Sequence, residues 1–244
     1  KNYFATNPEW FSMDEKGNRV NNRQLCFSNR DMRAEFIKNA LIFHKENEEK
    51  SGKKQYLGID LNDIAYNICC CKECAELQKK YNSPGGPLFD FLFEICAKYP
   101  QIQFGTLAYQ RSLTQTPPEN VKNFPENLTV IFCPINGLFS DTMDAKNKKD
   151  LDDLKGWTSL SKKVWIWYYP NPYNTNQELF FVPPPVGNIE RLQRDIISMH
   201  KAGAAGSYFE HDSGGINIGA NFSELQSWAM YRLFQNPYQD ADAL

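Results

Sequence analysis

Two short apolar segments of the sequence end abruptly in polar and acidic residues. Residues 56–61 run Tyr-Leu-Gly-Ile-Asp-Leu and are followed by Asn62 and Asp63. Residues 206–209 run Gly-Ser-Tyr-Phe and are followed by Glu210. Most glycosidases cleave a glycosidic bond with two carboxylic acids that flank the substrate. The pattern therefore suggests carbohydrate-cleaving chemistry, with Asp63 and Glu210 as the candidate catalytic acids.

The amide beside the first acid suits a mechanism in which the substrate's own acetamido group assists. Asn62 would orient that group while Asp63 protonates the leaving oxygen. Alternation along an extended chain places Asp60 on the same face as Asn62, so we include Asp60 as a substrate ligand. His211 joins this set because it directly follows Glu210. The alternative is structural, with an Asx turn at the first strand end and a solvated turn at the second.

Aromatic residues close two further apolar segments. Tyr109 ends one of them, and Trp165, Trp167 and Tyr168 lie around the end of another. Because sugars expose apolar C–H faces that stack on aromatic rings, Tyr109, Trp167 and Tyr168 are candidate sugar contacts. The alternation of Trp165 and Trp167 places both on one face, so they could equally fill the interior of a barrel.

The seven cysteines are unevenly distributed. Cys69, Cys71 and Cys74 lie within six residues and include a C-x-x-C pair. They predict a structural disulfide or a structural metal cluster, and the third alternative is plain buried thiols. A metal site needs four ligands, so a remote cysteine such as Cys26 or Cys133 would complete it. We expect no catalytic metal and no cofactor.

The order of elements predicts an α/β protein. Strands are expected at 56–61, 101–109, 128–133, 164–168 and 207–209, and helices at 30–50, 73–81, 88–99, 150–162, 188–201 and 223–234. Residues 1–28 are expected to form a long loop. Alternating strands and helices favour a parallel sheet with right-handed crossovers, and its carboxyl ends would carry the chemistry.

Five strands do not close a barrel of the (β/α)₈ TIM type. The prediction is therefore an open sheet or the later, incomplete part of such a barrel. In the second case residues 1–244 would be a single catalytic domain, truncated at the N-terminal side. The chain begins at Lys1 without Met, which we interpret as trimming.

Composition and motifs exclude several classes. The formal net charge of −2 does not favour nucleic acid as a partner, and no apolar run is long enough to span a membrane. The sequence has no G-x-S-x-G elbow, P-loop, H-E-x-x-H or G-x-G-x-x-G motif. The sequence therefore does not support a serine α/β-hydrolase, a nucleotide-binding protein or a zinc protease.

Several stretches in fixed order resemble a known family. They are Asn7-Pro8-Glu9-Trp10-Phe11, Gln24 to Asn29, Leu61-Asn62-Asp63 with Cys69, Cys71 and Cys74, Thr106 to Gln110 with Pro117-Pro118, Leu154 to Trp157, Trp165 to Tyr168, and Phe209-Glu210. The chain resembles domain-of-unknown-function family 4838 of Bacteroides-type secreted proteins. Some members form glycoside hydrolase family 163, endo-β-N-acetylglucosaminidases that act on complex N-glycans. The resemblance implies a (β/α)₈-type domain that begins upstream, and export to the periplasm or cell surface, which favours disulfides.

The leading hypothesis is thus a retaining glycoside hydrolase acting on glycans that contain N-acetylglucosamine. Asp63 would be the general acid/base and Glu210 a second carboxylate or a substrate ligand. The alternative is a non-catalytic glycan-binding protein of the cell surface on a degenerate barrel. A third hypothesis is a structural cell-surface domain that the cysteine cluster stabilises by cross-linking the chain. The expected partner is a glycan; the oligomeric state is left open.

Overall fold

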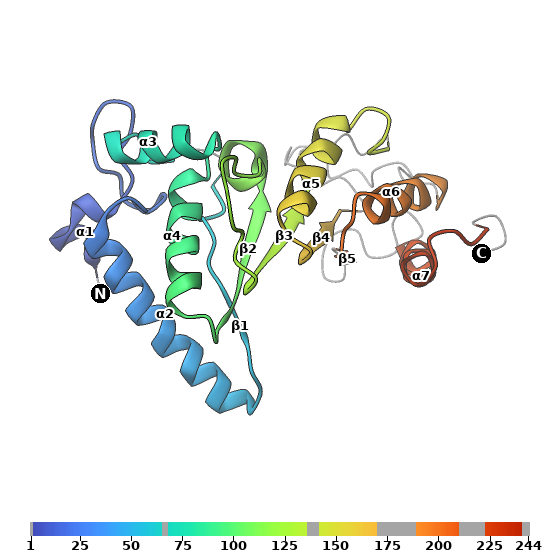
Figure 1. Ribbon diagram of the computed structural model, residues 1–244, viewed down its shortest axis with the longest axis horizontal. Coiled ribbons are helices and arrows are strands. Elements are labelled where there is room, and N and C mark those ends of the chain that lie inside the picture. Colours follow the sequence, from blue (N-terminus) through green and yellow to red (C-terminus); the bar gives the residue numbers. More distant parts are fainter. Residues whose placement is uncertain (1, 65–67, 136–141, 170–188, 210–222, 241–244) are drawn as a thin grey trace. The chain divides into compact units, whose positions relative to one another are not determined.

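The computed structural model of the chain describes all residues except 1, 65–67, 136–141, 170–188, 210–222 and 241–244 (Figure 1). Strands are β1 (Tyr56–Gly58), β2 (Gln103–Tyr109), β3 (Leu128–Cys133), β4 (Val164–Tyr168) and β5 (Gly206–Phe209). Helices are α1 (Tyr3–Thr6), α2 (Arg30–Ser51), α3 (Lys72–Tyr81), α4 (Gly86–Lys98), α5 (Lys148–Leu160), α6 (Ile189–Lys201) and α7 (Ser223–Gln235). None of the helices in these ranges is long and apolar enough to cross a membrane.

The five described strands form one parallel sheet in the order β1-β2-β3-β4-β5. Gly58 pairs with Gly105 at one end of the order, and Tyr168 pairs with Phe209 at the other. The prediction of an α/β fold with about five parallel strands is confirmed. Each strand is followed by helical structure, which is how a parallel sheet is connected.

One prediction about local structure is wrong, and one local element was not predicted. Residues 1–28 are not one long loop, because they contain α1 and a 3₁₀ turn, Pro8–Trp10, where Pro8 occupies the first turn and has no N–H to satisfy. A π-helical turn, Gln110–Thr114, follows β2 directly, and Gln110 begins it with a φ of 55°. Such turns have no clear hydrophobic period, so the sequence did not reveal them.

The chain divides into two compact units, Lys1–Ile131 and Phe132–Leu244, which we describe one at a time. In the first unit, α2 begins where the Asn29 side chain accepts the Met32 N–H at 2.9 Å. It ends at Gly52, whose φ of 65° suits a residue without a Cβ. A Cβ at Gly86 would collide with the Leu77 carbonyl oxygen, so that glycine allows α3 and α4 to pack closely.

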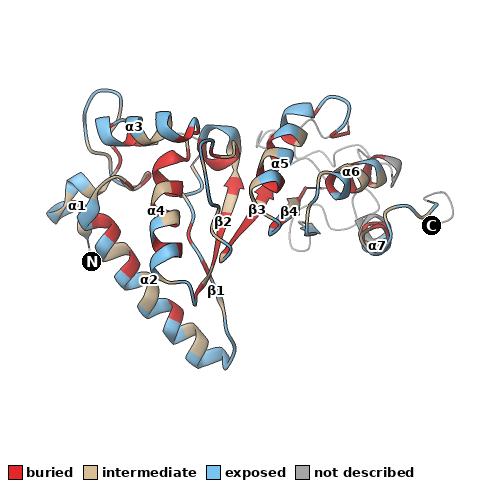
Figure 2. Ribbon diagram, viewed as in Figure 1, coloured by how far each residue is buried: buried red, intermediate tan, exposed pale blue. Residues whose placement is uncertain are grey.

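Strands β1 and β4 alternate between buried and more open residues, whereas β2 and β3 are buried over most of their length (Figure 2). In the first unit Leu57 and Ile59 are buried, whereas Tyr56 is 64% exposed. In the second unit Val164 and Ile166 are buried, whereas Trp165 is 43% exposed. The alternation is that of strands covered by helices on one side, and it decides which strand residues can reach a ligand.

Candidate functional site

The first candidate residue, Asp60, lies where β1 leaves the sheet. Its Oδ1 accepts the Leu107 backbone N–H at 2.6 Å, while the Thr106 hydroxyl donates to the Ile59 carbonyl at 2.9 Å. Side chains thus replace the last ladder bonds, which explains why β1 is shorter than predicted. Oδ2 lies over Gly58, which has no side chain to cover it.

Desolvation beside the sheet raises the pKa of the Asp60 carboxyl, and the hydrogen bond from Leu107 opposes this only in part. The residue as a whole is nevertheless exposed, so the carboxyl can be reached from solvent. A carboxyl with a raised pKa and an open side can donate a proton closer to neutral pH than an ordinary aspartate.

A clamp holds the segment that carries Asn62 and Asp63. Gln24 is buried, and its amide accepts the Asn62 backbone N–H at 2.8 Å and donates to the Asn62 carbonyl at 2.9 Å. The Asn62 side chain donates to the Arg23 carbonyl oxygen. Asn62 therefore uses its amide nitrogen to hold the loop through a long-range bond, which is not the local Asx turn of the structural alternative, while exposed Asp63 follows at the next position.

Tyr109, at the carboxyl end of β2, completes the candidate residues of the first unit. It is half-buried and lies two residues beyond Leu107, the hydrogen-bond partner of Asp60. Its backbone N–H donates to the Thr114 hydroxyl at 3.0 Å, within the π turn. The structure thus brings the strand ends that bear Asp60 and Tyr109 side by side, as expected for a parallel pair.

In the second unit, two neighbouring candidates have opposite surroundings. The Trp167 ring lies 6.3 Å from Tyr169, nearly parallel at 13°, and 5.3 Å from the ring of Tyr208. Tyr168 is buried and donates its hydroxyl to Asp195 at 2.7 Å. Trp167 can still serve as a sugar platform, whereas Tyr168 is a core residue. Glu210 and His211 lie outside the described residues.

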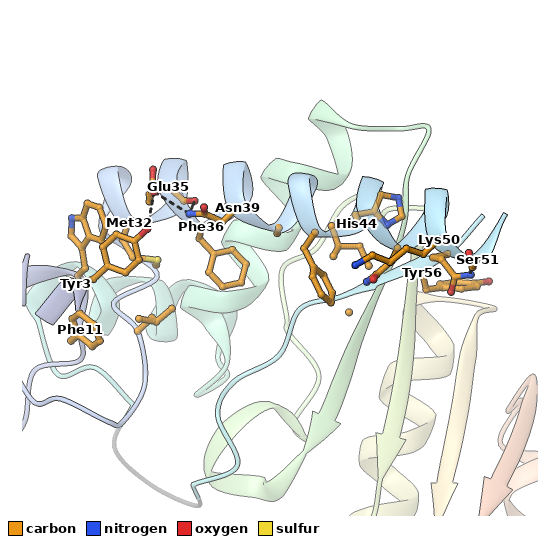
Figure 3. A pocket seen from close by; sticks show the side chains of 18 residues that line it. Tyr3, Phe11, Met32, Glu35, Phe36, Asn39, His44, Lys50, Ser51 and Tyr56 are labelled. Atoms are coloured by element: carbon orange, nitrogen blue, oxygen red, sulfur yellow. Dashed lines mark hydrogen bonds between the residues drawn. The ribbon is translucent and has the colours of Figure 1, made fainter. Parts of the chain in front are cut away.

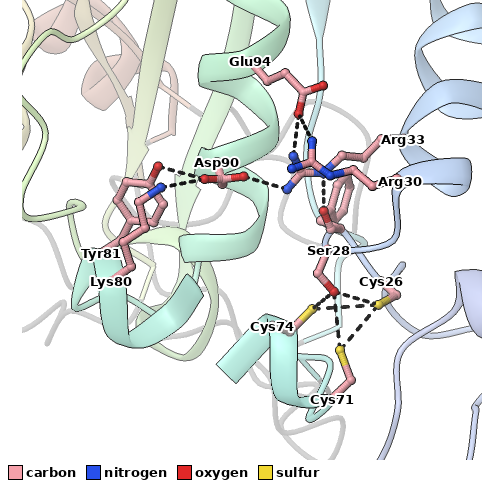
Figure 4. Close-up of polar contacts among 11 residues, drawn as sticks. Cys26, Ser28, Arg30, Arg33, Cys71, Cys74, Lys80, Tyr81, Asp90 and Glu94 are labelled. Atoms are coloured by element: carbon pink, nitrogen blue, oxygen red, sulfur yellow. Dashed lines mark hydrogen bonds and ion pairs between the residues drawn. The ribbon is translucent and has the colours of Figure 1, made fainter. Parts of the chain in front are cut away.

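Four cysteines form a second candidate site, within the first unit. The Sγ atoms of Cys26, Cys69, Cys71 and Cys74 all lie within 4.8 Å of one another, and all four residues are buried. Cys26 Sγ is 3.7 Å from Cys71 Sγ and 3.9 Å from Cys74 Sγ (Figure 4). Of the two remote cysteines considered as a fourth ligand, Cys26 joins this four-cysteine cluster. Each of its four members is a free thiol here.

Three segments bring these thiols together. Cys26 is held by its N–H, which donates to the Trp10 carbonyl at 2.8 Å, and the Cys70 N–H donates to the Met13 carbonyl at 2.8 Å. Cys71 is the N-cap of α3, and Cys74 lies in the first turn of that helix. The helix dipole favours negative charge at this end, so two of the four sulfurs lie where a thiolate is stabilised.

Hydrogen bonds between the thiols shift the pKa values of Cys26, Cys69 and Cys74 in different directions. Hydrogen bonds from Cys69 and Cys74 lower the pKa of the Cys26 thiol. The hydrogen bond between Cys69 and Cys26 raises the pKa of the Cys69 thiol to about 12. The hydrogen bond between Cys74 and Cys26 likewise raises the pKa of the Cys74 thiol. The opposite directions have one cause, because adjacent like charges cannot all form in a buried site without a counter-ion.

A groove of about 1110 Å³ runs along α2 on the first unit (Figure 3). Aromatic residues near the N-terminus line one end and β1 residues Tyr56 to Gly58 line the other. The Tyr3 hydroxyl donates to Glu35 at 2.8 Å. Hydrogen bonds lower the pKa of the Glu35 carboxyl to about 2, and the bond from Asn39 contributes more than the bond from Tyr3. No predicted site residue lines this groove. Sequence reasoning missed it because its walls come from separate segments.

The fold and these sites define a parallel α/β protein with polar strand ends and a buried thiol cluster. The family model described as "Domain of unknown function (DUF4838)" matches residues 1–244, and the chain belongs to that family. No curated protein and no solved structure matches the chain.

Proposed function

We propose that the chain is part of a glycoside hydrolase of the (β/α)₈-barrel type that acts on N-acetylglucosamine-containing glycans outside the cytoplasm, akin to glycoside hydrolase family 163. The observation that carries the proposal is the acid-bearing end of β1. There the reachable Asp60 carboxyl has a raised pKa, and Gln24 holds the adjacent segment with Asn62 and Asp63. Parallel strands place catalytic groups at this end.

The two acids have different proposed roles. Asp63 is the general acid/base, because it is exposed at the end of the clamped segment and follows the amide of Asn62. Asp60 is the second candidate for the proton donor, because desolvation beside the sheet favours its neutral form. Glu210 is the proposed second carboxylate or substrate ligand, and Trp167 and Tyr109 are proposed sugar contacts.

The barrel part of the proposal rests on the open surfaces of the first unit. Within the described residues β1 pairs with β2 alone, and its Tyr56 side chain is 64% exposed beside the groove along α2. Phe43 of α2 is 61% exposed at the same groove. An edge strand flanked by exposed aromatic side chains is what an incomplete barrel presents, because closure requires further strands to cover it.

The test is hydrolysis of a panel of released complex and high-mannose N-glycans by the longest natural protein that contains this chain. Products are identified by mass, and the anomer formed first distinguishes retention from inversion. Asp63→Asn is expected to lower kcat roughly 10²–10⁴-fold, the usual contribution of a general acid. Asp152→Asn, an exposed acid on α5, is the matched control and should retain wild-type turnover.

The outcomes separate the two carboxylates. If Asp63→Asn retains its rate while Asp60→Asn loses it, the proton donor is Asp60. If both variants and the wild type cleave no glycan in the panel, the hydrolase proposal is wrong.

A glycan-binding function is the second candidate, favoured by the aromatic group of Trp167, Tyr169 and Tyr208. Tyr208 is 39% exposed, and Trp167 packs against both neighbours. Binding without cleavage in a glycan array, lost in Trp167→Ala but kept in Asp63→Asn, would support this function over hydrolysis.

A further inference from the structure

The four-cysteine cluster has the dimensions of a tetrahedral metal site. Zinc–thiolate bonds are about 2.3 Å, so the edges of a regular ZnS₄ tetrahedron are about 3.8 Å. The measured Sγ separations of 3.7 Å (Cys26–Cys71) and 3.9 Å (Cys26–Cys74) agree with that edge. The remaining pairs are within 4.8 Å, so a small contraction would suffice.

Groups that can donate hydrogen bonds to thiolates already surround the sulfurs. The Met13 backbone N–H donates to Cys69 Sγ at 3.3 Å. The Cys74 thiol donates to the Ser28 hydroxyl at 3.1 Å, and the same hydroxyl lies 3.4 Å from Cys71 Sγ (Figure 4). Once these thiols are ionised, the hydroxyl can donate to them instead. Donors of this kind orient metal-bound thiolates and lower the charge on each sulfur. Their presence on both sides of the cluster indicates a site built for thiolates.

The charge balance also favours a divalent cation. Four buried thiolates without a counter-ion are prohibitively costly, and a divalent ion reduces their total charge from −4 to −2. Arg19 Nη1, 3.8 Å from Cys69 Sγ, supplies one further positive charge, and the first turn of α3 supplies part of another.

We propose that Cys26, Cys69, Cys71 and Cys74 bind one Zn²⁺ ion in a closed structural site. Four protein ligands leave no open position for a substrate or water, so the ion does no chemistry. All-sulfur coordination selects zinc or iron, and zinc needs no redox partner. The proposal does not depend on the proposed hydrolase activity.

The position of the site gives the ion a structural task. Cys26 follows Gln24 by two residues, and Gln24 clamps Asn62. Cys69 belongs to the same connection between β1 and α3 as Asn62. The ion therefore cross-links both sides of the clamp, and it holds the segment with Asn62 and Asp63 against the N-terminal segment.

The decisive measurement is the metal content of the chain purified without chelator or added metal. About one zinc per chain is expected, with an X-ray absorption shell of four sulfurs at about 2.3 Å. Replacement by Co²⁺ should give the intense absorption of cobalt bound to four thiolates. Stoichiometric iron would overturn the assignment to zinc. Absence of metal, or an intact mass lower by two hydrogens for each disulfide among these residues, would overturn the site.

Matched variants locate the ligands. Cys74→Ser should reduce the zinc content to below about a tenth of wild type, whereas Cys70→Ser, which changes the exposed cysteine of the same run, should keep one zinc per chain. If Cys74→Ser fails to fold, titration of the wild-type chain with an organomercurial decides the question. Release of one zinc as four thiols react supports the site; reaction of those thiols with no zinc release contradicts it.

Discussion

Two loops that connect a strand to a helix are fixed in different ways. In the first unit, the connection from β1 to α3 is tied to the N-terminal segment by the four-cysteine cluster. In the second unit, the connection from β3 to α5 is tied to α6 by one carboxylate. Asp195 of α6 accepts the Met143 N–H at 2.7 Å and the Tyr168 hydroxyl at 2.7 Å.

The two anchors differ in what they require. Asp195 is satisfied by two protein donors, so its network is complete by itself. The hydrogen-bond donors and positive charges around the four-cysteine cluster do not balance four thiolates. The cluster therefore needs a bound cation to become a strong anchor. With the proposed zinc bound, the anchor in the first unit depends on a metal ion, whereas the Asp195 anchor in the second unit uses donors of the protein itself.

Removal of the metal is expected to give the largest effect. Structural zinc contributes about 10–16 kcal/mol in small zinc-finger peptides, so loss of the ion should abolish most of the stability of the first unit. Mild acid with a strong chelator should strip the ion, because protons compete for thiolates. Hydrogen exchange would show fast exchange in residues 1–131 but slow exchange in 142–169, and added zinc would restore protection. If hydrogen exchange in residues 1–131 were the same before and after removal of the zinc, the two units would not differ in their dependence on a metal ion.

The Asp195 network should give the next largest effect. Asp195→Ala leaves the Met143 N–H and the Tyr168 hydroxyl without their acceptor, at about 1–3 kcal/mol for each buried group. The free energy of unfolding from urea titration should therefore fall by about 2–6 kcal/mol. Asp195→Asn is the control, because its amide can still accept from Met143 and donate to Tyr168. An equal loss in both variants would show that charge, and not hydrogen bonding, anchors the loop.

The clamp at Asn62 should give a smaller and local effect. Gln24→Ala removes two hydrogen bonds to the Asn62 backbone, which together contribute about 1–3 kcal/mol. Amide exchange at residues 61–64 should accelerate at least about fivefold, while exchange in α4 stays at the wild-type rate. Gln101→Ala, an exposed glutamine before β2, is the matched control. Unchanged exchange at 61–64 would mean that other contacts hold the segment.

The smallest effect is the pH dependence of the second unit. Burial raises the pKa of Asp195 in the folded state, and the hydrogen bond from Met143 and the nearby charge of Arg191 oppose this only in part. The folded state therefore holds the proton more tightly than the unfolded chain. Stability is lost as pH rises from the unfolded pKa near 3.8 to the raised folded pKa, by about 1.4 kcal/mol for each pH unit that separates the two pKa values.

Asp195→Asn cannot titrate, so it isolates this contribution. Its free energy of unfolding, minus that of wild type, should increase as pH rises through the window. A difference that stays constant from about pH 3.5 to about pH 7 would show that the folded and unfolded pKa values are equal.

Local patterns determined much of the fold. Hydrophobic runs located all five described strands, and Asn29 and Gly52 marked both ends of α2. The spacing of Cys69, Cys71 and Cys74 likewise predicted a cluster, because residues so close in sequence meet at the start of one helix. These features depend on neighbours within a turn or a strand, and such information lies in the sequence itself.

Tertiary structure decided the partners that lie far apart in the chain. Packing brought Cys26, and not Cys133, to the other three thiols, and it paired Gln24 with Asn62. It also buried Tyr168 in the core, whereas Trp167 stayed accessible. It also formed the groove along α2. These pairings join residues more than 25 positions apart, and they follow from the packing of whole elements, for which a single sequence contains no local signal.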